Sequence, residues 1–226
     1  MNFLFGLLTV ILVVIIVLNP SLIPLALILS IILLIVFILR NRDIQKQIYP
    51  PIKDKLHILN VDKGGVFTLT GVGDDSEELT LKVVSKNLYQ EGDFYWYELE
   101  CDKGSDEKVW VDVEDDDGVM VNVMLKKLTL SDIGVTSSRL DTIDDNESGS
   151  VRYGGSSYKY VDSDSAVFYR FCDSKNPQKF YYWDFVCGNR IISVEKWSDG
   201  SFDVSLSQRM LPSQITVLSN KNEEQV

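Results

Sequence analysis

Two stretches of the chain repeat one aromatic pattern, FYWYELEC at residues 94–101 and FYYWDFVC at residues 180–187. After each stretch, apolar and polar residues alternate, as in KVWVDVE at residues 108–114 and RIISVEKW at residues 190–197. Strict alternation is typical of β-strands, because successive side chains of a strand point to opposite faces of the sheet. The repeat therefore predicts an all-β region built from two similar copies.

Each copy also repeats its acids. Glu98 and Asp184 occupy equivalent places in the aromatic stretches, and Glu114 and Glu195 do so in the strands that follow. A symmetric pair of carboxylates could carry acid–base chemistry, so these four residues are the candidate catalytic groups. Packing explains the repeat without chemistry, because the neighbouring aromatic side chains supply large buried area to a small β domain. The sequence favours packing.

An acidic run, EDDDG, separates two predicted strands of the first copy. With its glycine at the sixth position of a calcium-binding loop, the first and twelfth positions would hold Val113 and Met124. Neither side chain can bind a hard cation. The candidates for a Mg²⁺ or Ca²⁺ site, or for a patch that docks a polycation, are Asp115, Asp116 and Asp117. Solvated turn residues explain these three acids better.

The acidic run ends in Asp117-Gly118, and the second copy has Asp199-Gly200 at the matching place. Asp-Gly is typical of two-residue hairpin turns, whose central residues need positive φ. We therefore expect a tight hairpin at each position. The other acids of the run do not recur in the second copy, which argues against a metal site built from the shared frame.

The predicted architecture after residue 55 is two tandem, similar halves, each a small antiparallel β-barrel or β-sandwich. The first β repeat covers residues 56–135 and the second covers residues 149–218. A polar, turn-rich connection at residues 136–148 joins them. Residues 219–226 are expected to form a disordered tail. The sequence leaves open whether the halves form separate barrels or share one sheet.

No charged residue precedes Arg40. Two apolar runs of about 18 residues flank the turn-forming stretch 19–24, and each would be about 27 Å long as a helix, close to the roughly 30 Å hydrocarbon core of a membrane. Residues 1–39 are therefore predicted to form a hairpin of two transmembrane helices, followed by a linker at residues 40–55. A cleaved signal peptide fits less well, because a basic n-region and a small-residue cleavage site are missing.

Charge predicts an orientation. Five basic and two acidic residues lie in residues 40–55, which therefore carry a net charge of about +3. Because the whole chain has a net charge of −11, the residues after 55 carry about −14. Because basic flanks stay in the cytoplasm, we expect a multi-pass protein of the inner, cytoplasmic, membrane with its β region in the cytoplasm. Three cysteines without close spacing agree with reduced thiols there. Phosphate would repel so acidic a region, which argues against a nucleic-acid partner.

Several segments together resemble the bacterial domain-of-unknown-function family catalogued as four-one-seven-eight, over most of residues 55–218. These segments are WYELECDKG, VWVDVEDDD, YYWDF, ISVEKW and PSQITVL. The resemblance brings no catalytic residues, because the family has no established activity. Its members are similar in being encoded near polyamine-synthase-like enzymes, small membrane proteins or envelope-stress proteins. The resemblance therefore implies an accessory role linked to envelope stress or polyamine metabolism.

Three functions stay open. The leading hypothesis is a membrane-anchored, non-enzymatic interaction module that presents its acidic β region to a protein partner. The main alternative is an enzyme that uses the repeated carboxylates, although the single histidine, His57, lies in an alternating stretch and no P-loop, nucleophile elbow or HExxH motif occurs. The third is a sensor of a small cation or a polyamine, which the negative charge permits. No cofactor is predicted.

Overall fold

The computed structural model describes residues 56–221, except residues 105–106 and 116–117. The chain divides into two compact units, residues 1–50 and 51–226, and the described residues belong to the second. They form eleven strands, one α-helix and three short 3₁₀ helices. The strands are β1 (Gly64–Val72), β2 (Glu77–Glu91), β3 (Phe94–Asp102), β4 (Lys108–Asp115), β5 (Val119–Leu128), β6 (Ser150–Tyr153), β7 (Ser156–Tyr169), β8 (Gln178–Cys187), β9 (Arg190–Trp197), β10 (Phe202–Met210) and β11 (Ile215–Lys221). The helices are η2 (Ile58–Asn60), α3 (Ser137–Asp145), η3 (Arg170–Cys172) and η4 (Pro212–Gln214).

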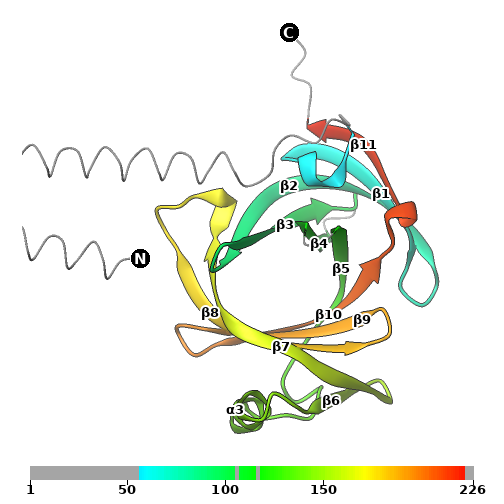
Figure 1. Ribbon diagram of the computed structural model, residues 1–226. Coiled ribbons are helices and arrows are strands. Elements are labelled where there is room, and N and C mark those ends of the chain that lie inside the picture. The colour runs from blue at the N-terminus through cyan, green and yellow to red at the C-terminus, as the bar shows by residue number, and fades with distance from the viewer. Residues whose placement is uncertain (1–55, 105–106, 116–117, 222–226) are drawn as a thin grey trace, which may run out of the picture. The chain divides into compact units, whose positions relative to one another are not determined.

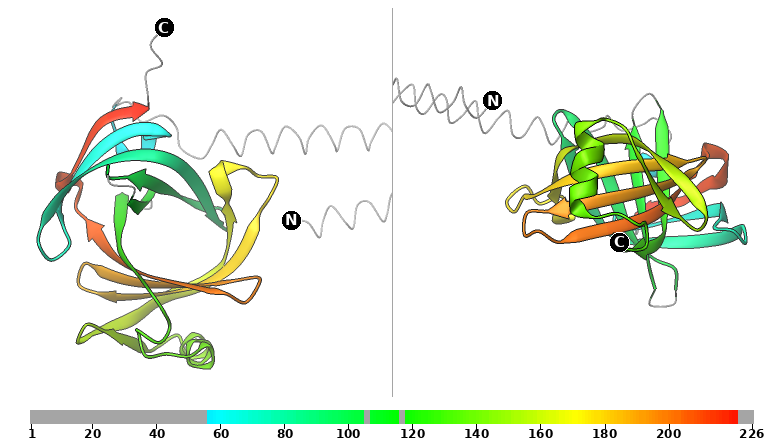
Figure 2. Two further views of the ribbon diagram at one scale, coloured as in Figure 1. Left: turned by 180° about the vertical axis from the view of Figure 1, so that it is seen from behind. Right: turned by 90° about the horizontal axis from the view of Figure 1, so that it is seen from below.

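All strands belong to one antiparallel sheet in the order β11-β1-β2-β3-β4-β5-β10-β9-β8-β7-β6. β2 also pairs with β7 through three residue pairs centred on Tyr89 and Phe168. This pairing closes eight strands, β2–β5 and β7–β10, into a barrel (Figures 1 and 2). β1 and β11 continue the sheet beyond β2, and β6 continues it beyond β7. An eight-stranded barrel has an interior that side chains fill or that is wide enough for one small ligand.

The prediction of two small barrels or sandwiches is wrong, and the question that the sequence left open is answered by one shared sheet. β10 of the second copy pairs with β5 of the first over seven residue pairs, β7 pairs with β2, and β11 pairs with β1. A copy on its own would leave unpaired strand edges, which are costly and prone to aggregation. Each copy covers the edges of the other, so both contribute to one sheet and one lumen.

The predicted fold class also included a transmembrane hairpin at residues 1–39, which lie outside the described residues. Within the described part of the chain, no helix is long and apolar enough to cross a membrane. The all-β part of the fold class is thus confirmed, and its transmembrane part has no support. α3 lies within the predicted connection, and β11 extends to Lys221, into the predicted tail.

The two predicted hairpin glycines do have positive φ, 133° at Gly118 and 86° at Gly200. The loop that contains Gly200 is longer than the expected two residues. β9 ends at Trp197 and β10 begins at Phe202, and the Trp197 N–H donates to the Ser201 carbonyl at 2.9 Å. The prediction of a two-residue turn is therefore corrected for Asp199-Gly200, because this bond closes a wider loop in which only the glycine needs the left-handed region. The first turn stays a prediction, since Asp117 lies outside the described residues.

The helix α3 covers an apolar cluster on the outside of the barrel (Figure 1). Its Leu140 and Ile143 lie three residues apart on one helix face and are fully buried. They belong to the same cluster as Phe185 and Ile192, which point outwards from β8 and β9. Because a core forms on the outward face of these strands, their inward face is free to carry polar residues.

Candidate functional site

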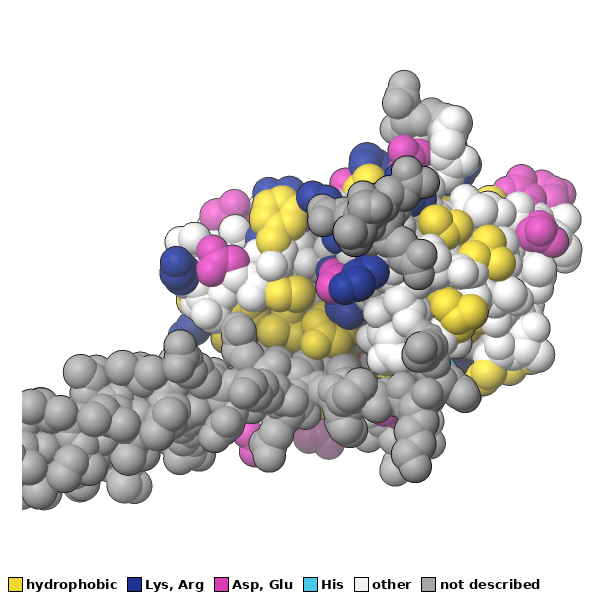
Figure 3. Space-filling view, turned by 90° about the horizontal axis from the view of Figure 1, so that it is seen from above, with side chains coloured by type: hydrophobic (Ala, Val, Ile, Leu, Met, Phe, Trp, Pro, Cys, Tyr) yellow, Lys and Arg dark blue, Asp and Glu magenta, His cyan; other side chains and the backbone are white. Residues whose placement is uncertain are grey.

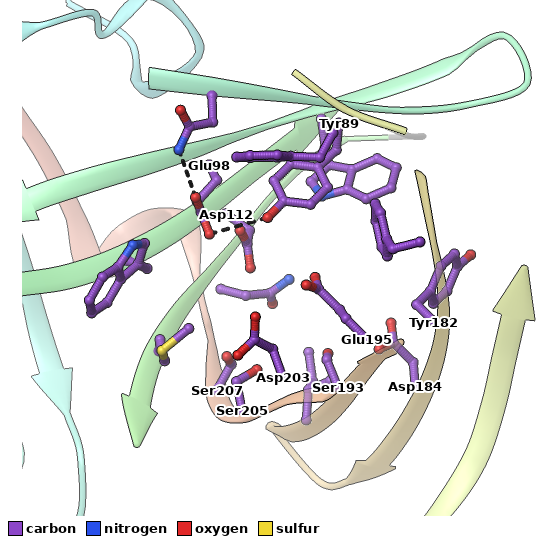
Figure 4. Close-up of a pocket in the computed structure, with 18 of the residues that line it drawn as sticks. Tyr89, Glu98, Asp112, Tyr182, Asp184, Ser193, Glu195, Asp203, Ser205 and Ser207 are labelled. Atoms are coloured by element: carbon purple, nitrogen blue, oxygen red, sulfur yellow. Dashed lines mark hydrogen bonds between the residues drawn. The ribbon is translucent and has the colours of Figure 1, made fainter. Parts of the chain in front are cut away.

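The lumen of the barrel contains a cavity of about 880 Å³. Residues from all eight barrel strands line it, and Figure 4 shows side chains of this lining pointing into the cavity. Such a volume lies in the usual range for small-molecule sites. The side chains therefore leave enough space in the cavity for a ligand.

Acidic side chains dominate the lining of the lumen. Nine acids line it: Glu91, Glu98, Glu100, Asp112, Glu114, Asp184, Glu195, Asp199 and Asp203. The basic residues that line it are Lys127, Arg170 and Arg209. By contrast, the outer face seen in Figure 3 has basic and acidic side chains side by side. Acids outnumber bases around this concave space, where low-dielectric walls focus their field on cations.

Glu98 on β3 is held by two neighbours from β2. The Asn87 amide Nδ2 donates to its Oε1 at 2.9 Å, and the Tyr89 hydroxyl donates to its Oε2 at 3.5 Å. Burial raises the pKa of Glu98, and the charge of Glu100 adds to this effect. The two hydrogen bonds act in the opposite direction, because they stabilise the ionised form.

Asp112 on β4 lies directly opposite Glu98 on one side and Asn122 of β5 on the other. No described side chain donates a hydrogen bond to the Asp112 carboxylate or forms an ion pair with it. Burial raises the pKa of Asp112, and the charges of Glu98 and Glu195 raise it further. The Oδ1 atom of Asn122 is also buried, without a donor in the described structure. This wall therefore offers two acceptors that lack partners.

Glu195 on β9 and Asp184 on β8 lie on the other side of the lumen (Figure 4). Burial, followed by the charge of Glu98, raises the pKa of Glu195 from 4.5 to about 8. Burial likewise raises the pKa of Asp184 from 3.8 to about 6, although a hydrogen bond from Ser193 opposes the shift. Among the described residues, none donates a hydrogen bond to the Glu195 carboxylate.

An aromatic layer adjoins the acids inside the barrel. Tyr89 stacks on Trp96 with ring centroids 5.1 Å apart, and Phe180 lies 4.9 Å from Trp197. Phe168 joins the two pairs, because its ring contacts both Tyr89 and Trp197. Aromatic faces carry partial negative charge and attract cations. The layer therefore adds to the preference of the lumen for a positively charged ligand that has apolar parts.

The structure brings together the four acids that the sequence singled out as catalytic candidates. Glu98, Glu114, Asp184 and Glu195 all line the lumen, although they come from four different strands. The pattern that revealed them was their recurrence at equivalent places in the two copies. Closure of both copies into one barrel is what places them around the same space.

Sequence reasoning missed Asp112, which lies between Glu98 and Asn122 in the centre of the acidic wall. A signal was present, because Trp110, Asp112 and Glu114 alternate with buried valines and so share one face of β4. Polar residues on that face pointed to solvent or to a polar interior, and the sequence does not distinguish the two.

The candidate metal ligands lie elsewhere. Asp115 is exposed at the end of β4, and Asp116 and Asp117 lie outside the described residues. In the described part of the chain, no group of three or more His, Cys, Asp or Glu side chains is arranged to hold a metal ion. His57 is the N-cap of η2, where its Nδ1 accepts from the Leu59 N–H at 3.3 Å. It does not line the lumen.

Comparison with known proteins identifies the domain. A family model described as Domain of unknown function (DUF4178) matches residues 75–212. The match begins just before β2 and ends at the start of η4, so it includes all eight barrel strands and leaves out β1 and β11. No curated protein and no solved structure matches the chain. Because the model covers more than half of the sequence, the chain belongs to the DUF4178 family.

Proposed function

We propose that the barrel lumen binds a small organic cation, and that the domain serves as a binding module and not as an enzyme. The observation that carries the proposal is the pair Asp112 and Glu195. These carboxylates face the lumen, and no described residue gives either of them a hydrogen bond or an ion pair. A protein partner, expected from the sequence, would respond to whether the lumen is occupied.

The reason is electrostatic. An ionised carboxylate inside a protein is costly unless a donor or a cation compensates it. A cation about 4 Å from a carboxylate contributes about 4 kcal/mol of attraction at an effective dielectric constant near 20, before the cost of desolvation. A bound cation would therefore allow the lumen acids to ionise. Binding at neutral pH should release protons from the groups with raised pKa, above all from Glu195.

An organic cation fits the lumen better than a metal ion. A hard metal ion needs several oxygen ligands that converge on one point. The described acids instead come from several strands around the lumen, and none of their groups is arranged for a metal. The aromatic layer of Tyr89, Trp96 and Trp197 favours an ammonium group with attached methylene or aromatic parts.

An enzyme is the second candidate, and one observation favours it. A carboxyl group with a pKa of about 8, as in Glu195, is protonated at neutral pH and would suit a general acid. The two candidates differ in what happens to the ligand. A binding module returns the amine unchanged, whereas an enzyme converts it, so mass spectrometry of the ligand after incubation with the protein separates them.

The test is a calorimetric titration of the full-length chain with alkylamines and with alkyl carboxylates of matched length, at about 0.15 M ionic strength to limit screening differences. We expect the amines to bind and the carboxylates not to bind. Combining Asp112→Asn with Glu195→Gln should abolish binding. Asp145→Asn is the matched control, because it removes an exposed charge at the end of α3. Equal binding of amines and carboxylates, or binding that survives the double substitution, would contradict the proposal.

A further inference from the structure

The acceptors in the lumen form two walls on opposite sides of the barrel. The first wall consists of Glu98 on β3, Asp112 on β4 and Asn122 on β5, which are adjacent in register. The second wall consists of Asp184 on β8 and Glu195 on β9. Within the ring of eight strands, β3 and β9 are four strands apart in either direction, and so are β4 and β8. The walls therefore face each other across the lumen (Figure 4).

On each wall, one acid accepts a hydrogen bond from a neighbouring side chain and another acid accepts none from any described residue. On the first wall, Glu98 accepts from Asn87, whereas Asp112 has no described donor. On the second wall, Asp184 accepts from Ser193, whereas Glu195 has no described donor. The buried Oδ1 of Asn122 is an independent sign of a ligand at the first wall, since it lacks a donor although it carries no charge.

One ammonium group donates three hydrogen bonds and carries one charge. The acceptors without a described donor lie on both walls, Asp112 and Asn122 on the first and Glu195 on the second. The charge of Lys127 opposes the rise in the pKa of Glu195, but Lys127, Arg170 and Arg209 form no ion pair with either carboxylate. Two separated positive charges satisfy both walls.

We infer that the ligand is a dication, with one ammonium group at Asp112 and Asn122 and a second at Glu195, joined by a short aliphatic spacer. This inference rests on the proposed function. The neighbouring aromatic layer gives the spacer an apolar surface, since the partly exposed rings of Trp96 and Trp197 border the lumen. If the ligand is a dication, the two walls should contribute separately to its affinity.

The experiment compares 1-aminobutane with 1,4-diaminobutane by calorimetric titration into the full-length chain, at equal pH and ionic strength. The two probes have the same carbon chain and differ in their second ammonium group. We expect the diamine to bind at least about tenfold more tightly, since one charge-assisted hydrogen bond contributes that much or more. Glu195→Gln should reduce this ratio to about one, because the variant keeps the first wall and loses the second. Asp145→Asn should leave it unchanged.

The outcomes separate this inference from the proposed function. Equal affinities of the two probes would overturn the dication and leave a monocation site in the lumen. A diamine preference that Glu195→Gln leaves intact would overturn the assignment of the second ammonium group to that wall. Binding of neither amine, by protein whose melting curve shows that it is folded, would overturn both proposals.

Discussion

On strand β8, Trp183 and Phe185 point outwards and are buried beneath α3, whereas Tyr182 and Asp184 point into the lumen. The outward face belongs to an apolar core, in which Phe185 is 0 % exposed and Trp183 is 2 % exposed. The inward face is half-buried and acidic. In most small barrels the interior supplies much of the core. Here the larger apolar cluster lies outside, beneath α3, and the aromatic layer forms a smaller one inside. The acidic part of the lumen can therefore keep groups that cost stability and serve binding.

The outer core should give the largest effect. Phe185→Ala removes a fully buried ring from the cluster beneath α3 and should lower the free energy of unfolding by about 3 to 5 kcal/mol. Chemical denaturation of the variant measures this loss. The matched lumen variant is Tyr182→Phe, which keeps the ring and removes the hydroxyl that donates to Glu91 at 2.7 Å. A smaller loss in Phe185→Ala than in Tyr182→Phe would reverse the contrast between the two faces.

The lumen should make stability depend on pH. The folded protein retains a proton on Glu195 up to a pKa of about 8, whereas an unfolded glutamate releases it near its ordinary value of 4.5. Between these values the native state binds more protons, so the free energy of unfolding falls as pH rises through this window. We expect a fall of about 2 kcal/mol after allowance for water in the lumen. Asp184 lowers the free energy of unfolding further as pH rises from its ordinary pKa of 3.8 to its raised pKa of about 6.

Unfolding curves measured from pH 5 to pH 9 check this dependence. Glu195→Gln should flatten the part between pH 6 and pH 8, because it removes the group that titrates there. Asp145→Asn should leave the curve unchanged, since it lies outside the lumen. Stability that rises with pH over this range in the unliganded protein would mean that the lumen acids are ionised and compensated by the protein itself.

Asp112 should show the smallest effect on stability and a large effect on binding. Asp112→Asn keeps the shape of the side chain and removes a buried carboxyl whose ionised form lacks a partner, so it should raise the free energy of unfolding by about 1 kcal/mol. The same substitution should weaken amine binding. Denaturation and titration of one sample measure both. A variant that loses stability without losing affinity would show that Asp112 has a structural role.

Much of the all-β fold was predictable from alternation, because strands such as β4 show one buried and one polar face. The joining of the two copies was not predictable, since period two fixes which residues share a face and does not name the partner strand. The pairing of β10 with β5 follows from tertiary closure alone. The same limit hid the lumen, because an acid facing the interior and an acid facing solvent have the same pattern.

The tryptophans show how a shift of one residue changes the outcome. Each of the two aromatic stretches contains one tryptophan, Trp96 in the first and Trp183 in the second. The sequence favours packing as the role of the aromatic side chains in both. Trp96 lies two positions before Glu98 and shares its face, so it lines the lumen. Trp183 lies one position before Asp184 and takes the opposite face, so it is buried beneath α3. Since alternate residues point to opposite faces, Tyr182 is the structural counterpart of Trp96.

A crystal structure of the full-length chain grown with 1,4-diaminobutane tests the central claim most directly. We expect density for the amine inside the barrel, with its nitrogen atoms about 2.7 to 3.2 Å from carboxylate oxygens of Asp112 and Glu195. The Oδ1 atom of Asn122 should gain a donor in the same structure. An amine bound only on the outer surface, with the lumen acids contacting ordered water alone, would contradict the claim that the lumen is a cation site.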